Sequence, residues 1–178
     1  MMTLVSGGSA SGKSEFAESL VLASAWNNRF YLATMMVFDE ECKKRIERHR
    51  LMRAKKNFQT IEVPIDLQKV SFPNCEGKIA LLECMSNLTA NEVFSPQRKA
   101  SLQELEEKIV QGVSFLCEQC NEVIVVTNEL FSDGIGYDSS TQEYLNLLGN
   151  INQHLALSAD RVFEVAAGIP ICWKGEQV

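Results

Sequence analysis

The chain has 178 residues, of which 46% are hydrophobic, and this suits one domain with a buried core. Its formal net charge of −6 argues against a nucleic-acid-binding protein. No uninterrupted apolar run reaches the roughly 18 residues that a membrane span needs, and the N-terminus does not resemble a cleavable signal. We therefore expect residues 1–178 to form a single domain, soluble and cytoplasmic, with no membrane span and no nucleic-acid partner.

The stretch from Gly7 to Ser14 reads Gly-Gly-Ser-Ala-Ser-Gly-Lys-Ser and fits the phosphate-loop pattern G-x-x-x-x-G-K-[S/T] at every fixed position. Residues 1–5 predict a buried strand before it, and residues 13–25 predict a helix directly after it. In that context the backbone N–H groups bind a phosphate, Lys13 reaches the β- and γ-phosphates, and the Ser14 hydroxyl binds Mg²⁺. The alternative is a glycine-rich turn that ends in Lys-Ser by chance.

Further buried strands are predicted over residues 29–34, 58–63, 78–84, 122–128 and 161–167. Between them, helices are predicted over residues 38–55, 97–120 and 140–158, with a shorter helical stretch before Pro96. Strands that alternate with helices imply parallel pairing with right-handed crossovers. The expected fold is a three-layer α/β P-loop NTPase (RecA-like) domain with a mostly parallel central sheet.

Two carboxylates follow predicted strands, at the sheet edge where open α/β folds bind ligands. Glu83 ends the apolar run Ile-Ala-Leu-Leu, the position from which P-loop proteins supply a second Mg²⁺ contact or a water-orienting base. The alternative for Glu83 is an ordinary strand-end carboxylate. Glu129 follows the strand predicted over residues 122–128 and is expected at the same edge.

The predicted helix over residues 38–55 carries most of the basic charge. Residues 43–56 include eight basic and one acidic side chain, a local charge of +7 that leaves −13 for the remainder. This suits a small polyanion such as a nucleotide, although a solvated helix face explains the charge equally well. His49 lies on the less polar face, where a histidine is more often a core residue than a catalyst. Neighbouring arginines favour phosphate chemistry at His49.

The cysteines and the second histidine indicate no further site. Cys117 and Cys120 form a C-x-x-C sequence, but no second pair lies at zinc spacing and the motif ends a helix. Reduced, structural cysteines are therefore expected. His154 has no carboxylate or cysteine at ligand spacing and is interpreted as structural or exposed.

Several strings beyond the phosphate loop resemble one family, the bifunctional adenosylcobinamide kinase/adenosylcobinamide-phosphate guanylyltransferases of cobalamin biosynthesis. The most specific of them is Arg45-Ile46-x-x-His49-Arg50-x-x-Arg53. Others are Tyr31-Leu32-Ala33-Thr34, Leu81-Leu82-Glu83-Cys84, Val126-Thr127-Asn128-Glu129 and Gly168-Ile169-Pro170. The resemblance covers almost the whole chain. After Glu129, residues 130–136 depart from the family's usual loop, which is expected to shape the corrinoid side.

The resemblance implies that His49 accepts GMP from GTP and passes it to adenosylcobinamide phosphate. It also implies a kinase step that uses the same loop, with GTP or ATP as substrate, Mg²⁺ as cofactor and a homotrimer as the assembly. His49 and Lys13 would be catalytic, and Ser14 and Glu83 would bind the metal ion. The implied nucleotide-binding residues are Gly7, Gly8, Ser9, Ala10, Ser11, Gly12, Lys13, Ser14, Ala33, Thr34, Met35, Arg50, Leu51, Met52, Arg53, Glu62 and Glu83.

Two other functions stay open at this point. One is a different P-loop kinase or NTPase for small molecules in which His49 is only structural. The other is a nucleotide-responsive binding protein without enzymatic activity, which the phosphate loop permits but which leaves His49, Glu83 and Glu129 unexplained.

Overall fold

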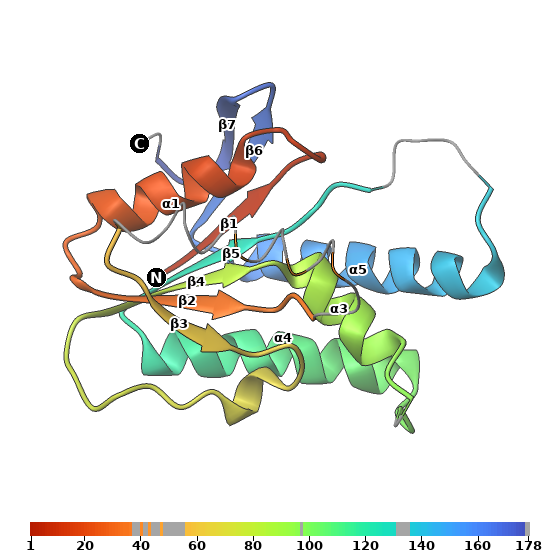
Figure 1. Cartoon of the computed structure of the whole chain (residues 1–178). Coiled ribbons are helices and arrows are strands. Elements are labelled where there is room, and N and C mark those ends of the chain that lie inside the picture. Colours follow the sequence, from red (N-terminus) through yellow and green to blue (C-terminus); the bar gives the residue numbers. More distant parts are fainter. Residues whose placement is uncertain are drawn as a thin grey trace.

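A mostly parallel sheet forms the centre of the molecule (Figure 1). The structure, a computed structural model, describes residues 1–36, 40, 43, 47, 56–96, 98–130 and 136–176. Its strands are β1 (Met2–Ser6), β2 (Asn28–Ala33), β3 (Gln59–Glu62), β4 (Lys78–Glu83), β5 (Glu122–Val126), β6 (Arg161–Ala166) and β7 (Ile169–Lys174). The helices in these ranges are α1 (Lys13–Ala23), α3 (Met85–Val93), α4 (Leu102–Gln119) and α5 (Ser139–Ser158), with a 3-10 turn η1 (Leu67–Lys69).

The strand order is β3-β2-β4-β5-β1-β6-β7, and every neighbouring pair is parallel except β6 and β7. The carboxyl ends of the parallel strands therefore meet at one edge of the sheet. In the strand register, Ala33 pairs with Glu62 on one side and with Glu83 on the other, and Glu83 pairs with Val126. This edge is where ligands bind in open α/β sheets.

Helices cover both faces of the sheet, as Figure 1 shows. On one face, α1 packs over a buried cluster that includes Val5, Leu81 and Ile124. On the other face, α3, α4 and α5 cover a larger cluster that includes Leu32, Leu82 and Val125. The two clusters alternate along each strand because successive side chains point to opposite faces. The predicted three-layer α/β fold with a mostly parallel sheet is confirmed.

Helix α4 shows where the helix boundary predicted from the sequence was wrong. The helix was expected to start at residue 97, but it begins at Leu102, and Ser101 caps its N-terminus. The Ser101 side chain accepts a hydrogen bond from the Glu104 N–H, and the Glu104 carboxylate accepts one from the Ser101 N–H. This reciprocal arrangement satisfies N–H groups that the first turn leaves without helical partners. The apolar side chains Leu105, Ile109, Val113 and Leu116 of α4 are buried.

The C-terminal hairpin was missed. The strand over residues 161–167 was expected to be the last, yet β7 returns antiparallel to β6. Ala167 and Gly168 connect the two strands with φ angles of 50° and 80°, the left-handed conformation that tight hairpin turns require. Pro170 weakens the strand signal of the sequence, and the edge position of β7 explains why this proline is tolerated.

The helix predicted over residues 38–55 falls almost entirely outside the described residues. So do His49 and the segment from Arg50 to Arg53.

Candidate active site

The phosphate loop joins β1 to α1 at the carboxyl edge of the sheet. A Cβ atom at Gly7 would lie 2.6 Å from the Val165 carbonyl oxygen, closer than real Cβ atoms approach a backbone atom. Gly12 has a φ of 91° and precedes the first residue of α1. Both positions therefore require glycine, the first because of close approach and the second because of its backbone conformation. This agrees with the two glycines that the motif fixes.

Lys13 lies inside the loop. The residue is 9% exposed, and its ammonium group donates a hydrogen bond to the Gly8 carbonyl oxygen at 2.9 Å. A cation held at the N-terminus of α1 lies next to the partial positive charge of the helix dipole. Together they form a site where an anionic phosphate is the favoured ligand.

Ser14 and Glu83 come together from two elements. Ser14 is the second residue of α1 and Glu83 is the last residue of β4, and the Ser14 hydroxyl donates a hydrogen bond to the Glu83 carboxylate. Two oxygen ligands of this kind, one of them anionic, fit a Mg²⁺ ion that takes its other ligands from phosphate and water. Among the described residues, no group of three or more His, Cys, Asp or Glu side chains could hold a metal ion by itself.

The turn between β6 and β7 supports the loop from the outside. The Gly168 N–H donates a hydrogen bond to the Ser11 carbonyl oxygen at 2.8 Å. A Cβ atom at Gly12 would lie 3.3 Å from the Gly168 Cα atom. Sequence reasoning missed this contact because it missed the hairpin, although Gly168 was part of the quoted family string. The hairpin turn thus stabilises the conformation of the phosphate loop at Ser11 and Gly12.

Thr34 fixes the backbone beyond β2. It is fully buried, and its hydroxyl accepts a hydrogen bond from the Cys84 N–H at 2.7 Å and donates one to the Cys84 carbonyl oxygen at 2.9 Å. The Asn91 amide donates to the Thr34 carbonyl oxygen at 2.8 Å. Met35 follows directly and is half-buried. The predicted site residues Ala33, Thr34, Glu62 and Glu83 therefore lie along one edge of three neighbouring strands.

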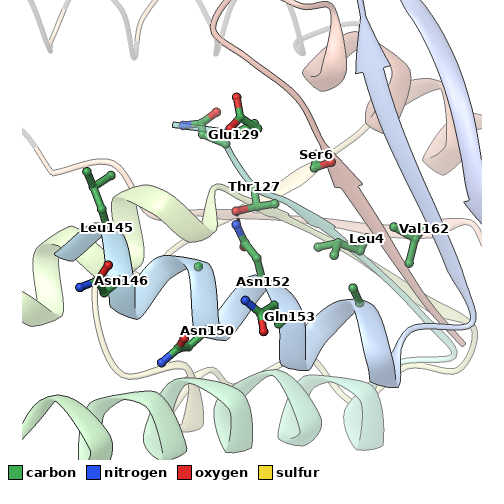
Figure 2. A pocket seen from close by; sticks show the side chains of 13 residues that line it. Leu4, Ser6, Thr127, Glu129, Leu145, Asn146, Asn150, Asn152, Gln153 and Val162 are labelled. Carbon is green, nitrogen blue, oxygen red and sulfur yellow. Dashed lines mark hydrogen bonds between the residues drawn. The ribbon is translucent and has the colours of Figure 1, made fainter. Parts of the chain in front are cut away.

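A second concave region lies on the opposite side of the sheet from α1, between α5 and strands β1, β5 and β6. It is a pocket of about 570 Å³, and Figure 2 shows the side chains that line it. The lining combines apolar side chains with the amides of α5, and includes Leu4, Ser6, Thr127, Asn128, Glu129, Leu145, Asn146, Asn150, Asn152, Gln153, Ala156 and Val162. Except for Glu129, none of these residues was singled out as a likely site residue by its chemistry.

The sequence did contain a signal for this pocket. Asn146, Asn150 and Gln153 recur at i, i+4 and i+7 and therefore share one face of α5. Thr127 and Asn128 follow β5, and the sequence drew attention to them only because Val126-Thr127-Asn128-Glu129 resembles the family. The hydroxyl of Thr127 donates a hydrogen bond to the Asn152 side-chain oxygen at 2.7 Å, which links β5 to α5 at the inner end of the pocket (Figure 2).

The cysteines behave as structural residues in the described part of the chain, where Cys75, Cys84, Cys117, Cys120 and Cys172 form no disulfide. Burial raises the pKa of the Cys120 thiol to about 11 and also raises the pKa of Cys117. An activated thiolate needs a lowered pKa, so these shifts do not support a reactive C-x-x-C pair. His154 is exposed as expected, but its Nε2 atom lies 3.0 Å from the Glu106 carboxylate of α4.

Comparisons with known proteins relate the whole chain to one family. The sequence profile described as "CobU: Cobinamide kinase / cobinamide phosphate guanyltransferase" matches residues 3–173. Two curated relatives are each 30% identical to the chain. One is the "Bifunctional adenosylcobalamin biosynthesis protein CobU" of Escherichia coli, with 96% of this chain and 98% of that protein covered. The other is the "Bifunctional adenosylcobalamin biosynthesis protein CobP" of Pseudomonas aeruginosa, with 99% of each covered.

Among solved structures, the flagellar accessory protein FlaH of Methanocaldococcus jannaschii has a TM-score of 0.51, with 98% of this chain and 78% of that chain covered. Its sequence identity of 14% means that the likeness shows the fold alone. Within the described ranges, none of the helices has the length and hydropathy of a membrane-crossing segment. The sequence profile and the curated relatives together show that this chain belongs to the cobinamide kinase/cobinamide phosphate guanyltransferase family.

Proposed function

We propose that this protein phosphorylates adenosylcobinamide and then transfers GMP from GTP to adenosylcobinamide phosphate, through a guanylylated His49, to give adenosylcobinamide-GDP. The observation that supports this most directly is the meeting of Lys13, Ser14 and Glu83 at the carboxyl edge of the sheet, in a chain of this family. These residues offer a cation in the loop and two oxygen ligands in contact beside it, which is what a nucleoside triphosphate with its metal ion requires.

In the kinase step, a hydroxyl oxygen of adenosylcobinamide attacks the γ-phosphorus of the nucleotide, GTP or ATP. The bond from the γ-phosphorus to the bridging oxygen breaks, the nucleoside diphosphate leaves, and the hydroxyl proton passes to solvent. Lys13 stabilises the negative charge that gathers on the phosphate oxygens. Its buried position inside the loop strengthens this interaction because water screens it less.

In the guanylyl transfer, a neutral imidazole nitrogen of His49 attacks the α-phosphorus of GTP and pyrophosphate leaves. A phosphate oxygen of adenosylcobinamide phosphate then attacks the same phosphorus, the P–N bond breaks, and the imidazole is released neutral. The covalent intermediate divides one difficult transfer into two easier ones. Arg50 and Arg53 are proposed to neutralise charge on the phosphates during both halves.

Mg²⁺ is the proposed cofactor, and Ser14 and Glu83 are the residues that would hold it, since their side-chain oxygens already lie in contact. When bound, it supplies positive charge to the phosphate oxygens of the nucleotide. The rest of the proposed nucleotide site consists of the phosphate-loop residues, Ala33, Thr34, Met35, Arg50, Leu51, Met52, Arg53, Glu62 and Glu83. Residues 1–178 are proposed to form one domain, assembled as a homotrimer.

The test is covalent labelling with GTP that carries ³²P at the α-phosphate, in the presence of Mg²⁺. We expect acid-labile, alkali-stable label on the protein, as a phosphoramidate requires, and no label on His49→Ala. The matched control is His154→Ala, which removes the chain's other histidine and should keep the label. A protein that binds GTP and stays unlabelled would contradict the guanylyl-transfer mechanism.

The kinase half is tested separately, with ATP or GTP labelled at the γ-phosphate and adenosylcobinamide as acceptor. Labelled adenosylcobinamide phosphate is the expected product, and His49→Ala should still form it. Label that appears only as inorganic phosphate, with no labelled corrinoid, would refute the kinase assignment.

A further inference from the structure

We propose that the pocket between α5 and strands β1, β5 and β6 binds the corrinoid substrate, receiving one edge of the macrocycle and its carboxamide side chains. This inference rests on the proposed function and assigns a place to its second substrate. The pocket, about 570 Å³ in volume, lies within the size range of small-molecule sites and is open enough to admit the edge of a larger ligand.

The position of the pocket relative to the phosphate loop supports the assignment. Ser6, the last residue of β1, and Glu129, which follows β5, both line it. The Glu129 N–H donates a hydrogen bond to the Gly7 carbonyl oxygen at 3.1 Å, so the rim of the pocket is joined to the first residue of the loop. A ligand that rests in the pocket therefore lies beside the loop, on the opposite side of the sheet from Ser14 and α1. Both proposed reactions need this side-by-side arrangement of acceptor and nucleotide.

The charge of the lining argues against a second nucleotide. Glu129 is the only charged residue that lines the pocket in the described part of the chain, and no lysine or arginine lines it there. Phosphate groups are bound in proteins by cationic side chains and backbone N–H groups, and a carboxylate nearby repels them. The pocket therefore suits a ligand without phosphate at the part that enters it.

The remaining lining matches the chemistry of a corrinoid. Leu4, Leu145 and Val162 provide apolar surface, and Asn146, Asn150 and Gln153, which share one face of α5, contribute amides to the lining (Figure 2). Cobinamide is an apolar macrocycle whose rim carries neutral primary carboxamides. Each such amide has two N–H donors and one carbonyl acceptor, and a side-chain amide of the protein offers the same set, so the two can pair.

Existing hydrogen bonds orient two of these amides. The Asn146 side-chain oxygen accepts a hydrogen bond from the Gln142 amide at 3.1 Å. The NH₂ group of Asn146 takes no part in that bond and can donate to a ligand. The Asn150 NH₂ group donates to the Glu106 carboxylate of α4 at 3.2 Å, which leaves its carbonyl oxygen as an acceptor. The two neighbouring positions therefore present one donor and one acceptor, the pattern that a carboxamide recognises.

The experiment measures equilibrium binding of dicyanocobinamide by its visible absorbance, using the full-length protein. Two variants alter the pocket. Asn146→Leu combined with Gln153→Leu removes two amides at nearly constant size, and Gln153→Trp fills the pocket with bulk. The control is Gln111→Leu, an exposed amide of α4 that does not line the pocket. Affinity for a fluorescent GTP analogue shows that each variant keeps a folded phosphate loop.

We expect dicyanocobinamide to bind the double variant about tenfold more weakly, as the loss of two hydrogen bonds predicts, and to bind Gln153→Trp more weakly still. GTP-analogue affinity should change less than twofold in both, and Gln111→Leu should match the natural protein. Unchanged corrinoid affinity in both pocket variants would overturn the assignment. If Gln153→Trp instead changed only the oligomeric mass by light scattering, the pocket would be a contact between subunits and the assignment would also fail.

The failure of the proposed function gives a different result. If the natural protein bound the GTP analogue but no dicyanocobinamide, and formed no labelled corrinoid in the kinase assay, the corrinoid substrate itself would be wrong. If the natural protein bound dicyanocobinamide and both pocket variants bound it equally well, only the location proposed here would be wrong.

Discussion

The two sides of the sheet carry two kinds of recognition. On the α1 side, a buried lysine, a serine and a glutamate meet around a loop that two glycines shape, and charge dominates. On the α5 side, neutral amides and apolar side chains line a pocket that has the Glu129 carboxylate at its rim. Under the two proposals, one sheet edge would hold an anionic ligand and a neutral, amide-bearing ligand next to each other, and neither site would suit the ligand of the other.

The largest difference between the two sides is expected when the charge of Lys13 is removed and the side-chain size is kept similar. In Lys13→Met we expect turnover in both the kinase and the guanylyl-transfer reactions to fall by about 10²- to 10³-fold, because the developing phosphate charge loses its cation. Dicyanocobinamide affinity should stay within twofold, because Lys13 does not line the α5 pocket. Initial rates and equilibrium binding measure the two effects.

Lys69→Met is the matched control for this experiment, since Lys69 is a surface lysine whose side chain is 81% exposed. It should retain full turnover. Equal losses of corrinoid binding and turnover in Lys13→Met would show that the two sides are not separable.

A second comparison sets two carboxylates at neighbouring strand ends against each other. Glu83→Gln removes the anionic oxygen beside Ser14, so the Mg²⁺ concentration for half-maximal turnover should rise about tenfold or more. Glu129→Gln, on the α5 side, should leave that Mg²⁺ dependence unchanged, whatever it does to corrinoid binding. Titration of Mg²⁺ at saturating nucleotide distinguishes them. A shift of the same size in both variants would refute the assignment of Glu83 as the metal-side carboxylate.

A third comparison uses two glycines of the same loop. Gly12→Ala places a Cβ in a left-handed conformation and 3.3 Å from the Gly168 Cα atom, so it should lower the free energy of unfolding by about 1–2 kcal/mol. Gly8→Ala places its Cβ in open space and should change stability by less than about 0.5 kcal/mol. Urea unfolding without nucleotide measures both. Equal destabilisation by the two substitutions would show that the left-handed position and the contact with the hairpin turn do not matter.

The α1 side was largely predictable from the sequence, and the α5 side was not. The phosphate loop is a local pattern, because its fixed residues lie within eight positions and its strand and helix flank it directly. The α5 pocket depends on how α5 lies against β1 and β6. More than a hundred residues separate β1 from α5 in the chain. The meeting of Ser14 with Glu83 was expected from the general phosphate-loop pattern, which assigns both residues to Mg²⁺, and not from their spacing, since 69 residues separate them.

Two of the errors had local signals. The start of α4 at Leu102 follows from Ser101 and Glu104, which fit the capping sequence S-x-x-E. The β6–β7 turn has glycine at its second central position, a feature of hairpin turns, but alanine at the first does not favour a left-handed φ. The pairing of β7 with β6 outweighs the preference of Ala167 for a negative φ. The sequence alone does not reveal the strength of that pairing.

The smallest expected effect concerns α5, whose amide face consists of Asn146, Asn150 and Gln153. Asp138 caps α5, where its carboxylate accepts hydrogen bonds from the Thr141 N–H at 2.9 Å and the Ser140 hydroxyl at 2.6 Å. These bonds, that of Ser140 first, lower the pKa of Asp138 from 3.8 to about 2. Because the pKa is depressed in the folded state, the carboxylate stabilises the protein above about pH 4, and this contribution is lost as pH falls toward 2.

Asp138→Asn keeps a capping side chain but removes the titration, so its urea midpoint should lie slightly below that of the natural protein at pH 6 and approach it near pH 2.5. Asp138→Ala removes the cap, so its midpoint should be lower at both pH values. A gap between the natural protein and Asp138→Asn that stayed constant from pH 6 to pH 2.5 would mean that the Asp138 charge does not stabilise α5. The amide face would then depend on packing against the sheet alone, and corrinoid binding should be insensitive to the cap.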